Sequence, residues 1–142
     1  MKNTFALYSL KAIDSPNFTM SPIELKDYIP FEVKRVYFIS KSKIGTSGEH
    51  CHFIEEELFV LVQGSATIII DKGQGKEEIA MIGPTSACYV PNYVWHGFRD
   101  ISPDAIILAL SSTNYSPDRS DYLENYDDYL KIRDQKLQTT SA

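Results

Sequence analysis

The sequence predicts an all-β barrel or sandwich that ends in one helix. Short apolar runs recur along the chain with turn residues between them, which is typical of sandwiches and barrels. Toward the C-terminus the apolar residues change from strand spacing to helical spacing. Because the 142 residues contain no internal repeat and no linker, we expect a single domain over residues 1–142.

The clearest strand is expected at 31–39, where the residues alternate between two faces. Arg35 and Tyr37 share one of these faces, because alternate residues of a strand point to the same side. Further strands are expected in apolar runs that Gly, Pro or Asp residues separate: 58–62, 66–70, 78–82, 86–90 and 105–111.

A helix is expected at about 119–135. Five large apolar or aromatic residues recur there at helical spacing: Tyr122, Leu123, Tyr126, Tyr129 and Leu130. Aromatic residues at this spacing more often pack than bind ligands, so we expect the stripe to pack against the outside of the barrel.

Composition excludes several classes of function. The net charge is −5 and the chain has no basic stripe, so no nucleic-acid partner is expected, although a few local cations could hold a nucleotide. No apolar run is long enough to span a membrane, and no secretory signal is apparent, so a cytoplasmic location is expected. In that compartment Cys51 and Cys88 are expected to be buried thiols.

The three histidines of the chain are concentrated in two strand segments, His50-Cys51-His52 and Trp95-His96. In a strand, His50 and His52 point into one space and Cys51 points away. Neutral imidazole can accept or donate a proton near neutral pH, and it is also a metal ligand. This pair of histidines is therefore the strongest candidate for a functional site.

The spacing of these residues resembles the two motifs of the cupins. His50-x-His52 is followed by Glu57 and Gly64, and Pro91 precedes His96 by five positions. The resemblance implies a double-stranded β-helix, also called a jelly-roll barrel.

A narrower resemblance links the chain to the dTDP-4-keto-6-deoxyglucose 3,4-ketoisomerases. It rests on the segments PFEVKRVYFI from Pro30, HCH from His50, VWH from Val94 and DYLENYDDYL from Asp121. The resemblance implies a metal-free homodimer that exchanges an N-terminal strand. It also implies isomerisation of a nucleotide-linked 4-keto-6-deoxyhexose to the 3-keto isomer, for deoxyamino sugars of O-antigen or S-layer glycans.

The resemblance implies roles for three catalytic residues. Such an isomerase removes the C3 proton beside the C4 ketone, passes through an enediol and returns a proton to C4. By resemblance, His52 is the carbon base and His50 carries protons between the oxygens. Tyr37 is expected to donate a hydrogen bond to the sugar.

Five further residues are expected to bind substrate or support the site. Arg35 could hold the pyrophosphate, or form only a surface salt bridge. Tyr93 and Trp95 could stack on thymine, although such aromatics are more often core residues. His96 and Glu57 are expected to support the histidine pair through hydrogen bonds.

The chain departs from the ketoisomerase pattern at several positions. Ser47 replaces an arginine, and an early Asp-x-Arg-Gly signature is missing, so a diphosphate contact is in question. Glu57 replaces a glutamine and completes a set of metal ligands: His50, His52, Glu57 and His96. A metal-dependent cupin enzyme and a non-catalytic nucleotide-sugar-binding cupin therefore remain open alternatives. Glu55 and Glu56 are expected to be solvated charges.

Overall fold

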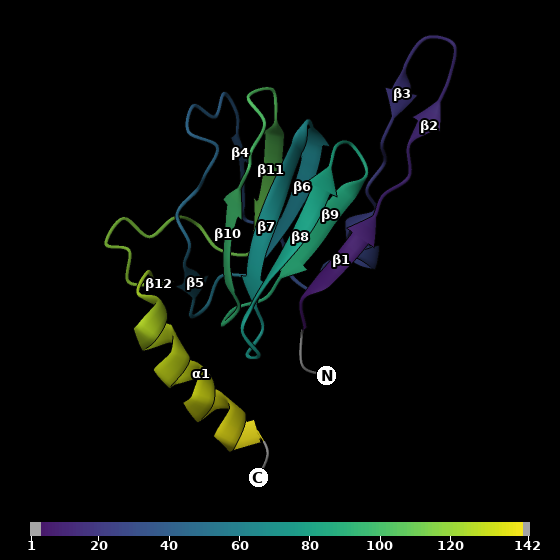
Figure 1. Ribbon diagram of the computed structural model, residues 1–142. Coiled ribbons are helices and arrows are strands. Elements are labelled where there is room, and N and C mark those ends of the chain that lie inside the picture. The colour runs from purple at the N-terminus through teal and green to yellow at the C-terminus, as the bar shows by residue number, and fades with distance from the viewer. Residues whose placement is uncertain (1–3, 141–142) are drawn as a thin grey trace.

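The computed structural model describes residues 4–140, and it consists of two antiparallel sheets packed face to face (Figure 1). The larger sheet has the order β1 (Ala6–Ser9), β9 (Ser86–Val90), β6 (Glu57–Gln63), β11 (Ile106–Ser111) and β4 (Arg35–Ile39). The smaller sheet has the order β10 (Trp95–Arg99), β7 (Ser65–Asp71) and β8 (Lys76–Ile82). The predicted all-β barrel with a C-terminal helix is confirmed.

Two short strand pairs and two helices complete the fold. They are β2 (Ile13–Asp14) with β3 (Thr19–Met20), β5 (Cys51–His52) with β12 (Tyr122–Leu123), the 3-10 helix η1 (Leu25–Asp27) and the helix α1 (Tyr126–Thr140). The β2–β3 hairpin and α1 extend from opposite ends of the barrel (Figure 1). No helix among the described residues is both long and apolar enough to cross a membrane.

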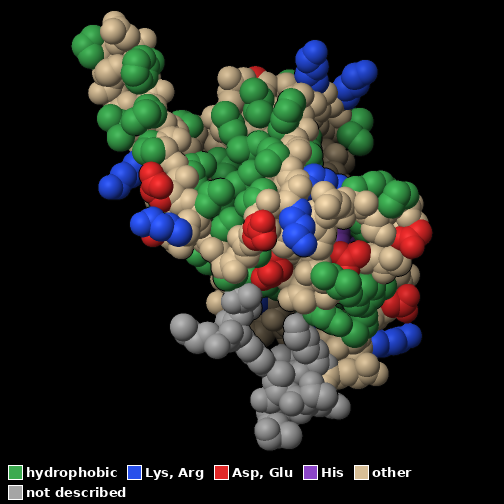
Figure 2. Space-filling view, turned by 180° about the vertical axis from the view of Figure 1, so that it is seen from behind, with side chains coloured by type: hydrophobic (Ala, Val, Ile, Leu, Met, Phe, Trp, Pro, Cys, Tyr) green, Lys and Arg blue, Asp and Glu red, His purple; other side chains and the backbone are tan. Residues whose placement is uncertain are grey.

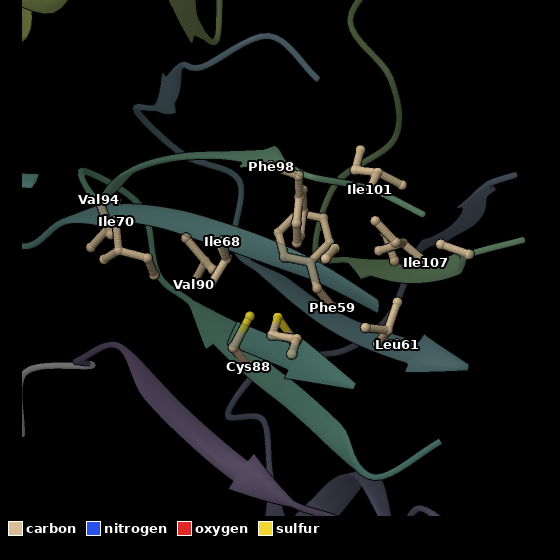
Figure 3. Close-up of a cluster of buried hydrophobic side chains, with 14 residues drawn as sticks. Phe59, Leu61, Ile68, Ile70, Cys88, Val90, Val94, Phe98, Ile101 and Ile107 are labelled. Atoms are coloured by element: carbon tan, nitrogen blue, oxygen red, sulfur yellow. The ribbon is translucent and has the colours of Figure 1, made fainter. Parts of the chain in front are cut away.

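The main core lies between the two sheets. Figure 3 shows its buried side chains, which come from both sheets and the loops that join them: Phe59, Leu61, Ile68, Ile70, Cys88, Val90, Val94, Phe98, Ile101 and Ile107. Each strand contributes alternate residues, because successive side chains point to opposite faces of the sheet. Tyr37 and Ile39 close the core beside β4.

The outer face of the larger sheet carries a second apolar cluster, which the segment 23–33 partly covers. This corrects the predicted strand at 31–39, since the strand begins only at Arg35. Phe31 and Val33 instead pack over the outer face of the sheet. Alternation alone could not separate a covering segment from a strand, because both bury every second residue.

The predicted helix at 119–135 begins later than expected. Tyr122 and Leu123 pair with His52 and Cys51 as a short strand, so the helix cannot include them. α1 begins at Tyr126, after Asn125, whose side-chain oxygen accepts a 2.9 Å hydrogen bond from the backbone N–H of Asp128.

The aromatic residues of α1 pack against the barrel as predicted. Tyr129 is fully buried in a cluster with Cys51 and Trp95. Its hydroxyl donates to the backbone carbonyls of Asp71 at 2.9 Å and Tyr93 at 3.1 Å. The helix therefore supports the strands that carry the histidines. Cys51 and Cys88 are both buried, in different clusters, as predicted.

Candidate active site

A cavity of about 310 Å³ lies between β4 and β10, the edge strands of the two sheets. Its walls come from the two sheets, the segment 47–50 and the segment 119–124, which includes β12. Three of the predicted site residues line it: Tyr37, His50 and His96. Tyr37 and the histidines therefore share one space, although they are far apart in the sequence.

The histidine segment is held against β10 by backbone hydrogen bonds. The N–H of His50 donates to the carbonyl of His96 at 3.0 Å, and the N–H of His96 donates back at 2.9 Å. Gly97 permits this close approach, since a Cβ at that position would lie 2.6 Å from Cγ of Glu49. Ser47 contributes too, because its hydroxyl accepts a 2.9 Å hydrogen bond from the N–H of Phe98.

The imidazoles of His50 and His52 face each other as the strand spacing predicts. Their Nε2 atoms are 3.1 Å apart. The ring of His96 lies 4.7 Å from that of His50, and its Nδ1 is 3.0 Å from the carbonyl oxygen of Val94, an acceptor that fixes the ring orientation. The three imidazoles thus form one cluster; His50 and His96 line the cavity, whereas His52 is 2% exposed and does not.

Three carboxylates surround His52. Its Nε2 lies 3.1 Å from Glu55 and 3.3 Å from Glu57, and its Nδ1 lies 3.3 Å from Asp121. Both ring nitrogens therefore face negative charge, which favours the imidazolium form.

Glu55 is not the solvated charge that the sequence predicted. It is 3% exposed. Its carboxylate accepts hydrogen bonds from the hydroxyls of Ser111 and Thr113 and lies 3.3 Å from Nη2 of Arg35. The charge is tolerated in the interior because Arg35 and His52 compensate it. Its neighbour Glu56 is only partly buried and accepts from the hydroxyl of Tyr89.

The two facing histidines have opposite proton affinities. Burial, together with the positive potential of His96 and His52, lowers the pKa of His50 to about 3. Burial also disfavours the charged form of His52, but a hydrogen bond and the charge of Glu57, with Glu55 and Asp121, raise the pKa of His52 above its ordinary value. At neutral pH the pair therefore consists of a neutral His50 and a His52 biased toward the protonated form.

Glu57 is the charged centre of this arrangement. Burial acts to raise its pKa, but hydrogen bonds and charge from His52 and His96 outweigh this and hold the pKa of Glu57 well below its ordinary value. Burial and the negative charge of Glu57 raise the pKa of Tyr37 well above its ordinary value. The phenol of Tyr37 therefore stays protonated and donates its hydrogen bond to Glu57.

The comparisons with known proteins identify the family. The family model FdtA (WxcM-like, C-terminal) matches residues 3–134, which is most of the chain. The chain belongs to this WxcM-like family.

Individual relatives of this WxcM-like protein agree with the match. It is 37% identical over 122 residues to the TDP-4-oxo-6-deoxy-α-D-glucose-3,4-oxoisomerase of Aneurinibacillus thermoaerophilus, a match that covers 85% of this chain and 86% of the relative. The structure of the sugar 3,4-ketoisomerase QdtA from Thermoanaerobacterium thermosaccharolyticum in complex with TDP is similar at a TM-score of 0.83 and 30% identity, covering 96% of this chain and 98% of QdtA. The TDP-quinovose 3,4-ketoisomerase WlaRB of Campylobacter jejuni gives a TM-score of 0.80 at 30% identity, covering 92% of this chain and 99% of WlaRB.

Four predicted binding residues of this WxcM-like protein do not line the histidine cavity; one of them, Glu57, is 2% exposed and contacts His52 and His96 instead. Arg35 lines a neighbouring cavity of about 150 Å³, on the other side of Tyr122. Trp95 is 2% exposed and packs on the aromatic residues of α1, so its burial argues against stacking on a ligand. Tyr93 packs against Phe53 and does not line the cavity either.

The structure adds residues that the sequence reasoning did not select. Tyr122 lies over the facing imidazoles, with its ring 5.1 Å from His50 and 4.5 Å from His52. Asp121 contacts His52, and Arg119 lines the cavity. Asp121 and Tyr122 begin the segment that resembles the family, but the helical spacing of Tyr122 predicts a helix there, whereas Tyr122 pairs with His52 as a strand residue.

The donor atoms of four side chains also lie close enough together to hold a metal ion. The ligand atoms of His50, His52, Glu57 and His96 all lie within 4.8 Å of one another. Three imidazoles and one carboxylate suit zinc, iron, manganese or nickel. A bound divalent cation would act as a Lewis acid toward a carbonyl oxygen.

Proposed function

We propose that this protein is a sugar 3,4-ketoisomerase, which converts a nucleotide-linked 4-keto-6-deoxyhexose, with TDP as the nucleotide, to its 3-keto isomer. The observation that carries the proposal is the pair of facing imidazoles with opposite proton affinities beside an open cavity. The reaction needs both a base and an acid at adjacent carbons. The names of the relatives support the same reaction and the same nucleotide.

The electrostatics favour the reverse of the roles that the resemblance implied, in which His52 is the carbon base and His50 carries protons between the oxygens. We assign the removal of the C3 proton to His50, because a neutral imidazole has a basic nitrogen that can accept it. We assign protonation of the C4 oxygen to His52, because the surrounding carboxylates favour its charged form. These two transfers convert the ketone to an enediol.

The second half of the reaction reverses the proton movements. The protonated His50 returns its proton to C4, and the C3 hydroxyl gives its proton to His52, which produces the 3-keto isomer and restores both side chains. Tyr37 and Glu57 act as positioning residues, since their hydrogen bond holds the carboxylate near His52. His96 supports the pair through Glu57.

The test is exchange of the C3 proton with solvent deuterium, followed by NMR on a TDP-linked 4-keto-6-deoxyglucose. The His50→Asn variant should lose exchange at C3 by at least about 10²-fold, since general base catalysis is worth roughly that much or more. Lys131→Gln on the exposed face of α1 serves as a control with normal exchange. Undiminished exchange in His50→Asn would overturn the assignment, and tight TDP binding without any exchange in the wild type would indicate a binding module.

A metal-dependent cupin enzyme is the second candidate function, because the four donor atoms converge as a cation requires. Elemental analysis of the purified protein separates the two candidates. Stoichiometric metal, with activity lost after its removal and regained after its return, would favour this second function. Full turnover by chelator-treated protein that contains no metal would favour the proton-transfer mechanism.

We also propose that two copies form a homodimer, with their N-terminal segments exchanged or interlocked. Val36 and Phe38 are 57% and 67% exposed on the outside of β4, and Figure 2 shows hydrophobic side chains gathered over this side of the barrel. Phe18 is likewise exposed on the projecting β2–β3 hairpin. Exposed apolar surface of this kind is typical of protein interfaces.

The oligomeric state can be measured by light scattering after size exclusion. We expect the wild type to elute as a dimer and Phe38→Glu to elute as a monomer. Ile82→Glu, a comparably exposed position on β8, is the matched control and should remain a dimer. A monomeric wild type would contradict the proposal.

The location and the reaction sequence are proposed on chemical grounds. The substrate is a nucleotide sugar, which favours a cytoplasmic enzyme. A 3-keto sugar is the substrate that an aminotransferase needs, so the product would supply deoxyamino sugars for lipopolysaccharide or related glycans.

A further inference from the structure

The histidine cavity has one cationic side chain among the described residues that line it, Arg119. Two carboxylates, Glu49 and Glu124, line the same cavity. Lys76 compensates Glu49 from outside the cavity at 3.0 Å. Among the described residues that line the cavity, Arg119 is therefore the one permanent cation that could offset the negative charge of an anionic ligand.

The guanidinium of Arg119 is held in a defined position. Its Cζ lies 4.0 Å from the centre of the Tyr122 ring, and its Nη2 donates to Glu124. The backbone of Arg119 has a φ of 57°, in the left-handed region that residues other than glycine adopt only rarely. The stacking and the bond to Glu124 together hold the guanidinium over Tyr122.

This position places the cation close to the proposed proton-transfer centre. The ring of Tyr122 that supports the guanidinium lies 5.1 Å from the ring of His50. Arg119 and His50 thus both lie beside the ring of Tyr122. In a nucleotide-linked hexose the diphosphate is attached at C1, and C3 is two ring bonds away. A sugar with C3 at His50 therefore has its diphosphate about one sugar ring from the imidazole.

We propose that Arg119 binds the diphosphate of the nucleotide-linked substrate. A guanidinium has five N–H donors, so its bond to Glu124 leaves others for phosphate oxygens, which arginine binds in a bidentate manner. Arg119 is 48% exposed, so its guanidinium is accessible to a ligand. Arg35 is less suited to this role, because it contacts buried Glu55 and lines the neighbouring cavity.

The inference rests on the proposed function, and the test compares two ligands that differ only in the diphosphate. Binding of TDP and of thymidine is measured by NMR titration for the wild type, Arg119→Gln and Arg119→Lys. We expect Arg119→Gln to weaken TDP binding roughly ten- to a hundredfold, as loss of a charge-assisted hydrogen bond does, and to leave thymidine binding unchanged. Arg119→Lys should retain more of the TDP affinity than the glutamine variant, because it keeps the charge.

Arg99→Gln is the matched control. Arg99 is 43% exposed and pairs with Glu78, much as Arg119 pairs with Glu124, but it does not line the cavity. TDP binding by this variant should equal that of the wild type. Unchanged TDP affinity in Arg119→Gln, or an equal loss for TDP and thymidine, overturns the inference while the isomerase proposal stands. If the wild type isomerises the sugar but binds TDP no more tightly than thymidine, the role of Arg119 is overturned and the isomerase proposal stands. If the wild type neither binds TDP nor isomerises the sugar, both proposals are overturned.

Discussion

The Nδ1 atom of His52 lies 3.3 Å from the carboxylate of Asp121, while its Nε2 faces Glu57 at the same distance. The Nε2 of His50 lies 3.1 Å from the Nε2 of His52, but burial and the neighbouring imidazoles lower the pKa of His50. Two chemically identical side chains on one strand segment thus acquire different protonation states. The difference arises because carboxylates surround His52, whereas burial and neighbouring imidazoles dominate at His50.

This difference predicts the pH dependence of kcat/KM. The proposed reaction needs a neutral His50 and a protonated His52. Lowering the pH protonates His50 only near its lowered pKa, so the acid limb should lie well below 6.5. Raising the pH removes the proton of His52 above 6.5, because its pKa is raised, so the alkaline limb should lie above that value.

Initial rates from pH 4 to pH 10 provide the measurement. The two limbs report macroscopic pKa values of the coupled pair rather than of one ring. An acid limb at or above pH 6.5 would contradict the proposed protonation states.

Replacing Glu57 by glutamine should shift the alkaline limb to lower pH. Glutamine preserves the size of the side chain and can still accept the hydrogen bond from Tyr37, but it removes a charge that raises the pKa of His52. If that pKa falls by about one unit, kcat/KM above the new limb falls by up to about tenfold, while the rate at lower pH changes little. Glu56→Gln, which alters a carboxylate bonded to Tyr89, is the matched control with an unshifted profile.

The same variant also tests the metal alternative. A Glu57→Gln protein that has lost bound metal and is inactive at every pH would assign Glu57 as a ligand. A shifted profile without a change in metal content would assign it as the group that keeps His52 protonated.

Asp121→Asn should lower kcat more than it raises KM. The carboxylate of Asp121 accepts hydrogen bonds from the N–H groups of Ile54 at 2.7 Å and Glu55 at 3.1 Å, in addition to facing His52. Asparagine keeps one oxygen but loses the charge, so we expect roughly a tenfold loss of kcat and an alkaline limb at lower pH. Asp128→Asn, at the exposed start of α1, is the control.

The pH profile distinguishes positioning from structural support in Asp121→Asn. If thermal stability falls but the alkaline limb stays in place, Asp121 supports the backbone of 54–55 and does not act on His52.

The barrel and the facing histidines can be predicted from the sequence because both follow from local periodicity. The strands β6, β7, β8, β9 and β11 agree with the predicted ranges to within about two residues, and His50 and His52 point into one space as alternate strand residues must. The motif spacing also predicts that Glu57 and His96 belong to the site. In the structure Glu57 lies beside both His52 and His96.

The remaining features depend on tertiary contacts. Tyr122 is compatible with helical spacing, and only its pairing with His52 makes it a strand residue over the active site. Glu55 resembles a surface charge until Arg35 and Ser111 are seen to surround it. Arg119 lies in a polar loop whose sequence gives no sign that it forms a cavity wall.

The helix α1 should contribute strongly to stability through Tyr129. Its ring is buried against Trp95, the residue that precedes His96, and two backbone carbonyls share its hydroxyl proton. Tyr129→Phe removes only these hydrogen bonds and should lower the free energy of unfolding by about 1–3 kcal/mol, since two buried carbonyls lose a donor. Tyr129→Ala also leaves a cavity and should cost about 3–5 kcal/mol, as other large-to-small aromatic changes do. Urea denaturation measures both changes, with Lys131→Ala on the exposed side of α1 as a neutral control. Equal unfolding midpoints for Tyr129→Ala and the wild type would show that α1 does not stabilise the barrel.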